Sequence, residues 1–150
     1  MKNNSDKNNA SKVVSAGGVV YRRTNDIIEI ILCGLGIPPS RWGLPKGTPN
    51  HKETIVETAI RETQEETGLA VSVEQTLGSI NYQFIGHPGW TLYDKTVYFY
   101  LMAPIGGSIS DHDDEFDQVE WLKIETALNT VTHENEARII RQALELIKED

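Results

Sequence analysis

The sequence has little of several features that would point away from an ordinary globular protein. It contains one cysteine, Cys33, in 150 residues, so no disulfide can form within the chain. Its apolar neighbours, Ile30 to Leu32, indicate a buried thiol in a reducing compartment. No apolar run reaches the roughly 18 residues of a membrane-spanning helix. The N-terminus lacks a signal-peptide core. We therefore expect a cytoplasmic protein with no membrane partner.

Positive charge is also scarce in this chain. It carries 14 Lys and Arg against 22 Asp and Glu, for a net charge of −8. This balance argues against a protein that wraps a nucleic-acid duplex, because such proteins need a basic face. It does not exclude a polyphosphate ligand, because metal ions can supply positive charge locally.

The hydrophobic patterns predict one α/β domain. Met1 to Ser11 is polar and has little to bury, so we expect a disordered tail followed by a domain over residues 12–150. Glu134–Lys148 has the apolar spacing of an amphipathic helix, and Asp111 to Asp117 is an acidic loop. β-forming runs predict strands at Val13–Tyr21, Ile27–Cys33, Trp42–Lys46, Ala70–Val73, Thr76–Ile85, Lys95–Met102 and Val119–Ile124. These elements favour a mixed sheet flanked by helices.

A second helix has clear signals at both ends. Thr54 and Glu57 form the Thr-x-x-Glu pattern of a capping box. Gly68 is the expected end of the helix. Between them, helical spacing predicts a buried stripe composed of Ile55, Val56, Ala59, Ile60 and Thr63.

Three acids, Glu62, Glu65 and Glu66, share one strip of this helix because positions three and four apart lie on the same side. Acids so spaced repel each other by about 0.2–0.5 kcal/mol per pair, and the helix macrodipole favours cations near this end. A hard divalent ion would remove the conflict, with Mg²⁺ as first choice and Mn²⁺ as a substitute. Arg61 can brace the strip and reach back to Glu53.

The stretch from Gly47 to Leu69 resembles the Nudix box of the Nudix hydrolases. Gly47 and Glu53 precede the run Arg-Glu-Thr-Gln-Glu-Glu-Thr-Gly-Leu of residues 61–69. Thr63 departs from the signature, which prefers a bulky aliphatic residue there, and its hydroxyl can bond back to its own helix. The resemblance extends over Val13 to Ile147 and is strongest from Trp42 to Leu69.

This resemblance implies a Nudix-type α/β/α sandwich, as in MutT-like and diadenosine tetraphosphate hydrolase-like pyrophosphohydrolases. It implies that Glu53 and Arg61 brace the loop and helix. The implied metal ligands are the backbone carbonyl of Lys46 and the carboxylates of Glu62, Glu65 and Glu66. The general base stays open between Glu62 and the loop acids Asp113, Asp114, Glu115 and Asp117. Glu115, six residues before Trp121, is favoured among them.

Cations and aromatic rings outside the box are candidates for contact with a substrate. Lys95 is favoured because Lys95-Thr96-Val97 followed by aromatic residues resembles a strand of diadenosine tetraphosphate hydrolases. Bases stack on aromatic rings with about 1–3 kcal/mol each. Strand alternation separates Val97, Phe99 and Leu101 from Tyr98 and Tyr100, and one of the two sets must be core. The candidate substrate-binding residues are Arg41, Lys46, Lys95, Tyr82 and Phe99.

These features together lead us to expect a Mg²⁺-dependent pyrophosphohydrolase acting on a nucleoside diphosphate linked to another group. A dinucleoside polyphosphate or a nucleoside triphosphate, oxidised nucleotides included, ranks first. Diphosphoinositol polyphosphates and nucleotide sugars rank lower, since a highly phosphorylated inositol would need more Lys and Arg. The alternative is a catalytically silent Nudix-fold module that senses a nucleotide and regulates a partner. We expect a monomer or a homodimer.

Overall fold

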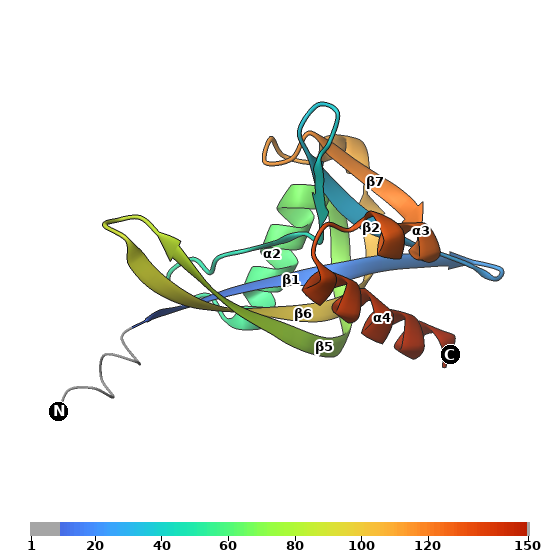
Figure 1. The fold of residues 1–150 in the computed structure, drawn as a ribbon. Coiled ribbons are helices and arrows are strands. Elements are labelled where there is room, and N and C mark those ends of the chain that lie inside the picture. Colours follow the sequence, from blue (N-terminus) through green and yellow to red (C-terminus); the bar gives the residue numbers. More distant parts are fainter. Residues whose placement is uncertain (1–9, 150) are drawn as a thin grey trace.

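A seven-stranded mixed sheet organises the chain (Figure 1). The computed structural model describes residues 10–149. Strand order is β3-β2-β1-β6-β5, with β4 also pairing with β1 and β7 with β2. Strands β1 and β6 are parallel, and the other pairs are antiparallel. The strands are β1 (Ser11–Thr24), β2 (Ile27–Leu35), β3 (Arg41–Gly43), β4 (Lys46–Gly47), β5 (Leu69–Gly86), β6 (Thr91–Gly107) and β7 (Gln118–Lys123).

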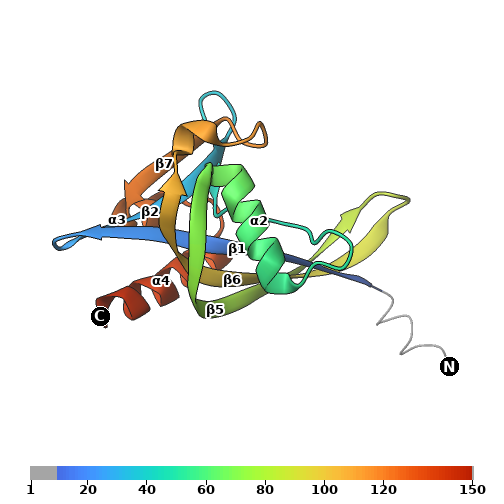
Figure 2. The ribbon, with the colours of Figure 1, turned by 180° about the vertical axis from the view of Figure 1, so that it is seen from behind.

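Helices cover both faces of this sheet, which confirms the predicted α/β/α arrangement (Figures 1 and 2). Helix α2 (Ile55–Thr67) packs on one face. Helices α3 (Ile124–Thr130) and α4 (Glu134–Lys148) pack on the other, and the short helix η1 (Ile109–Asp111) follows β6. None of the helices within residues 10–149 is long and apolar enough to cross a membrane.

The alternation along β6 decides which aromatic side chains are core. Val97, Phe99 and Leu101 are at most 2% exposed and belong to the cluster under α4, whereas Tyr98 is 39% exposed. The prediction that Phe99 contacts a substrate is therefore wrong, because its ring is enclosed by the core. Cys33 is fully buried, as predicted, and burial raises the pKa of its thiol.

Several predicted boundaries need correction. The two strands predicted between Ala70 and Ile85 form one strand, β5, because bulges absorb the irregular pattern there. The strand predicted over Trp42–Lys46 is divided, since β3 pairs with β2 and β4 pairs with β1. Helix α3 was not predicted. Most of the predicted N-terminal tail, residues 1–9, lies outside the described residues, but Ser11 belongs to β1.

The hairpin of β5 and β6 extends beyond the body of the molecule (Figure 1). Its buried part ends at the facing pair Ile80 and Val97, which are 2% and 0% exposed. From there the two strands continue to the turn between Gly86 and Thr91. In this outer part of the hairpin, residues 81–85 of β5 are exposed and most of the facing β6 residues are partly exposed.

Candidate active site

Helix α2 is built as its end signals predict. The Thr54 side chain accepts the Glu57 N–H and the Glu57 side chain accepts the Thr54 N–H, while Gly68 adopts the left-handed conformation with φ 80°. Its buried side differs from the predicted stripe, because Val56 is 37% exposed. Thr63 is buried, but its hydroxyl has no hydrogen-bond partner within the described chain, so the expected bond back to the helix is absent. The buried residues are Thr58, Ala59, Thr63, Glu66 and Thr67.

Arg61 braces the site as predicted. Its Nε donates to Glu53 Oε2 at 2.7 Å and its Nη2 donates to Glu53 Oε1 at 3.0 Å. Its Nη1 lies 3.3 Å from Glu62 Oε2 and 3.2 Å from Glu65 Oε1, while Nη2 also donates to the Thr48 carbonyl at 2.9 Å. The Arg61 guanidinium holds the pKa of Glu53 down at about 2. One guanidinium thus joins the loop before α2 to the acid strip of the helix.

Glu66 is the buried member of the acid strip, at 2% exposure. Burial raises its pKa to about 8, although the Lys46 N–H donates to Glu66 Oε1 at 3.1 Å and opposes the shift. The neighbouring charge of Glu62 adds to the increase, and burial also raises the pKa of Glu62. Gly47 leaves room for this arrangement, since a Cβ there would lie 2.1 Å from Glu62 Cδ.

The donor set here fits a hard divalent cation. Glu62 and Glu66 offer oxygen atoms only, and burial disfavours their charged forms unless positive charge is close. Within residues 10–149, no three His, Cys, Asp or Glu side chains form a ready metal-binding group. An incomplete protein cage suits Mg²⁺, which keeps several waters and binds through a few carboxylates together with substrate phosphates.

The loop between β3 and β4 is held from the opposite side of the sheet by Glu136. This carboxylate, 3% exposed, accepts the Leu44 N–H at 2.8 Å and lies 3.1 Å from Lys46 Nζ. Gly17 of β1 lets the loop approach closely, because a Cβ there would lie 2.0 Å from the Pro45 carbonyl oxygen. Sequence reasoning missed Glu136. The available signal was an acid on the apolar side of α4, at i−4 from Ile140.

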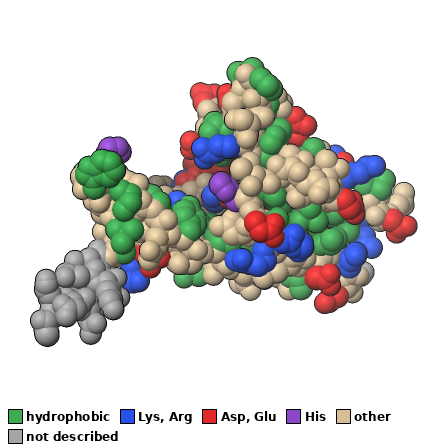
Figure 3. All heavy atoms as spheres, viewed as in Figure 1, with side chains coloured by type: hydrophobic (Ala, Val, Ile, Leu, Met, Phe, Trp, Pro, Cys, Tyr) green, Lys and Arg blue, Asp and Glu red, His purple; other side chains and the backbone are tan. Residues whose placement is uncertain are grey.

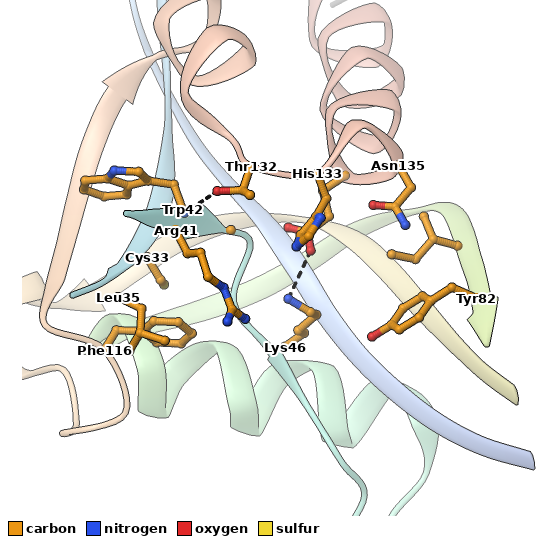
Figure 4. Close-up of a pocket in the computed structure, with 13 residues that line it drawn as sticks. Cys33, Leu35, Arg41, Trp42, Lys46, Tyr82, Phe116, Thr132, His133 and Asn135 are labelled. Atoms are coloured by element: carbon orange, nitrogen blue, oxygen red, sulfur yellow. Dashed lines mark hydrogen bonds and ion pairs between the residues drawn. The ribbon is translucent and has the colours of Figure 1, made fainter. Parts of the chain in front are cut away.

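A cavity of about 490 Å³ opens beside this loop. Three predicted substrate-binding residues, Arg41, Lys46 and Tyr82, line it (Figure 4). Lys95 is half-buried close by, and burial together with the Lys46 charge lowers its pKa. The remaining lining residues are Cys33, Leu35, Trp42, Gly43, Ile80, Phe116, Thr132, His133, Asn135 and Glu136.

Asn135 is a second cavity residue that the sequence did not reveal. Its Oδ1 is buried and has no hydrogen-bond partner within residues 10–149. A buried polar atom without a partner costs about 1–3 kcal/mol. Asn135 and His133 both project from the start of α4 at the cavity wall (Figure 4). The cavity thus offers an amide that a ligand with hydrogen-bonding edges would satisfy.

The acidic loop lies at the C-terminal end of α2. The Asp113 N–H donates to the Glu65 carbonyl at 2.9 Å, and the Glu115 N–H donates to Asp113 Oδ1 at 3.0 Å. Glu115 is exposed, and its charge raises the pKa of Glu66. The fold therefore brings the predicted loop acid within electrostatic reach of the acid strip.

The buried glutamate, its neighbouring acids and the adjoining cavity define an acid-rich site in a helix–sheet–helix sandwich. A sequence model of the NUDIX domain family matches residues 11–143, and the chain belongs to that family. MutT4 of Mycobacterium tuberculosis is 42% identical over 106 residues, which is 71% of this chain and 42% of MutT4. The chain thus spans less than half of that relative.

Two further comparisons concern one organism, Caenorhabditis elegans. Its asymmetrical bis(5′-nucleosyl)-tetraphosphatase is 27% identical over 139 residues, covering 87% of this chain and 93% of that protein. The crystal structure of a C. elegans Ap4A hydrolase binary complex superposes with a TM-score of 0.71 at 20% identity, covering 92% of this chain and 99% of that one. At that identity the structural likeness supports the fold alone.

Proposed function

We propose that this chain is a Mg²⁺-dependent pyrophosphohydrolase that cleaves a phosphoanhydride bond in a nucleoside diphosphate linked to another group. The observation that carries the proposal is the buried Glu66, whose carboxylate has Glu62 as a neighbour. The adjoining cavity is lined by the basic side chains of Arg41 and Lys46. Family membership and the similarity to the bis(5′-nucleosyl)-tetraphosphatase support the same reaction class. Dinucleoside polyphosphates and nucleoside triphosphates are the first substrates to test.

The proposed metal ligands are Glu62, Glu65, Glu66 and the Lys46 carbonyl. A bound Mg²⁺ would neutralise phosphate charge and increase the acidity of the attacking water. Arg61 holds Glu53, Glu62 and Glu65 in place. In the proposed reaction Glu62 or Glu115 accepts a proton from the attacking water, and the carboxyl nearer to that water is the general base.

The cavity is the proposed nucleoside site. Lys46 and Lys95 would contact the phosphate oxygens, because Lys46 lines the cavity and its charge acts on the half-buried Lys95. The unpartnered Asn135 Oδ1 would accept an N–H from the edge of a base. The Tyr82 ring at the cavity wall would support the base by stacking.

The direct test is a panel of nucleoside triphosphates, oxidised nucleotides and dinucleoside polyphosphates with Mg²⁺ in ¹⁸O-labelled water. Product identification reports the bond that is cleaved and the phosphorus atom that is attacked. Wild type should release product, Glu66→Gln should be slower by at least about tenfold, and Glu145→Gln, an exposed acid on α4, should match wild type. Calorimetric binding of nucleotides without turnover in any form would instead support the nucleotide-sensing alternative.

A further inference from the structure

The open end of the β5–β6 hairpin carries three aromatic rings on one face, Tyr82, Phe84 and Tyr93, which we name the hairpin aromatic row. Tyr82 and Phe84 are two residues apart on β5, so they point to the same side. Tyr93 stands opposite Phe84 on β6. The Phe84 and Tyr93 rings are stacked with centroids 5.1 Å apart, and Tyr82 lies 6.0 Å from Phe84.

This row continues outward from the cavity. Tyr82 lines the cavity wall, whereas Phe84 and Tyr93 lie beyond it and are not among the lining residues. Phe84 is 39% exposed. Figure 3 shows hydrophobic side chains gathered on the projecting hairpin. Contiguous exposed apolar surface of this kind is a common mark of a binding site.

The outer ring pair is held in place by its surroundings. The Tyr93 hydroxyl donates to the His87 carbonyl at 2.7 Å. Gly86 adds no side chain over the rings, and a Cβ there would lie 3.2 Å from both Phe84 Cε2 and Tyr93 Cε2. A ring pair that is already fixed and partly exposed can receive a flat partner without first becoming ordered.

A cation stands between this ring pair and the cavity. Lys95 faces Tyr82 across the hairpin and lies two residues from Tyr93, which is about 7 Å along a strand. Within residues 10–149 no carboxylate forms an ion pair with Lys95, whereas Lys46 is paired with Glu136. A half-buried ammonium without an anion, close to a second ammonium, favours a negatively charged ligand.

We propose that the two outer rings of the hairpin aromatic row, Phe84 and Tyr93, are a subsite for a second nucleobase, so that the preferred substrate carries two nucleosides joined by a polyphosphate. One nucleoside occupies the cavity, Lys46 and Lys95 contact the phosphate chain, and the distal base stacks on Phe84 and Tyr93. This inference rests on the proposed function. Along this face the ring pair, the Lys95 ammonium and the cavity follow one another. This is also the order of the distal base, the phosphate chain and the other nucleoside in such a ligand.

The test compares Phe84→Ala with Ile85→Ala, a matched control. Ile85 is the next residue, points to the opposite face and is 54% exposed. Steady-state kinetics would use diadenosine tetraphosphate and ATP, and the corresponding guanosine pair, with Mg²⁺. Phe84→Ala should raise KM for the dinucleoside at least about fivefold and leave the triphosphate KM within about twofold. Phe84→Trp should retain the wild-type KM, because it keeps a stacking ring.

Three results would overturn the subsite. One is an equal KM change for both substrate classes in Phe84→Ala, and another is an equal effect of Ile85→Ala. The third is conversion of a dimer to a monomer by Phe84→Ala with KM unchanged, measured by light scattering, which would assign the rings to a second copy of the chain.

Calorimetry separates failure of the subsite from failure of the proposed function. It would use methylene-bridged analogues of the dinucleoside and of the triphosphate, neither of which can be hydrolysed. Phe84-dependent binding of the dinucleoside analogue, without hydrolysis of any natural substrate, would support the subsite and contradict the proposed function. Hydrolysis of triphosphates without binding of the dinucleoside analogue would do the reverse.

Discussion

Replacing Glu136 by Ala should destabilise the protein by about 3 kcal/mol. The carboxylate is 3% exposed and serves two groups, the Leu44 N–H at 2.8 Å and Lys46 Nζ at 3.1 Å. Without it, the buried Leu44 amide has no acceptor, which costs about 1–3 kcal/mol. Removing one partner of a buried ion pair costs about 3–5 kcal/mol. The Lys46 side chain retains 25% exposure, so water recovers part of that cost.

The measurement is urea unfolding of wild type, Glu136→Ala and Glu136→Gln at one pH. Glu136→Gln keeps an oxygen acceptor for the Leu44 N–H and loses only the charge, so its loss of unfolding free energy should be smaller. For a chain of this length, 3 kcal/mol corresponds to a fall in Tm of about 6–12 °C. A loss below about 1 kcal/mol in Glu136→Ala would refute the reasoning, because it would mean that neither partner needs the carboxylate.

Three other perturbations test the acid strip. Arg61→Ala should lower turnover and reduce the unfolding free energy, measured by urea unfolding, by about 2–3 kcal/mol, because the surrounding acids lose the guanidinium that pairs with them. Unchanged unfolding free energy and turnover would exclude the bracing role of Arg61. In EDTA, the unfolding free energy of wild type should fall as pH rises from 4.5 to about 8, because over this range folded Glu66 keeps a proton that the unfolded chain releases. Glu66→Gln should reduce this dependence of unfolding free energy on pH. An equal dependence in both proteins would contradict the raised pKa of Glu66. Glu53 acts in the opposite direction, because its stabilising contribution is present above pH 4.5 and is lost as pH falls towards about 2. Gly47→Ala should reduce turnover at least about tenfold, because the added Cβ displaces the Glu62 carboxylate. Gly106→Ala is the control, because a Cβ there meets only Ala70 Cβ at 3.8 Å. Equal activity of the two variants would argue against the need for glycine at position 47.

The parts of the site that sequence could predict are those fixed by local geometry. The capping box at Thr54 and the left-handed Gly68 define α2, and the spacing from Glu53 to Arg61 places the guanidinium on the loop. The alternation of residues around Phe99 also predicted that this strand has two different faces and that one of them belongs to the core. Choosing that face required knowing where α4 packs, and this choice is where the prediction for Phe99 failed.

The parts that sequence could not predict depend on elements far apart in the chain. Glu136 lies 92 residues from Leu44, and only the packing of α4 against the β3–β4 loop brings them together. The single strand β5 replaced two predicted ones because its bulges keep pairing with β6 through an irregular pattern. Asn135 could be recognised only from its unpartnered oxygen at the cavity wall.

The net charge of −8 and a polyphosphate substrate are compatible because the charges are segregated. On one side, burial disfavours the ionised forms of Glu62 and Glu66, and a divalent ion bound between them would stabilise those ionised forms. On the other side, Lys46 lines the cavity and Lys95 lies close to it, and among the described residues Glu136 forms an ion pair with Lys46 but not with Lys95. Under the proposed function, a phosphate chain lying between these two sides would meet positive charge on both of them, since the acid strip would then carry the metal.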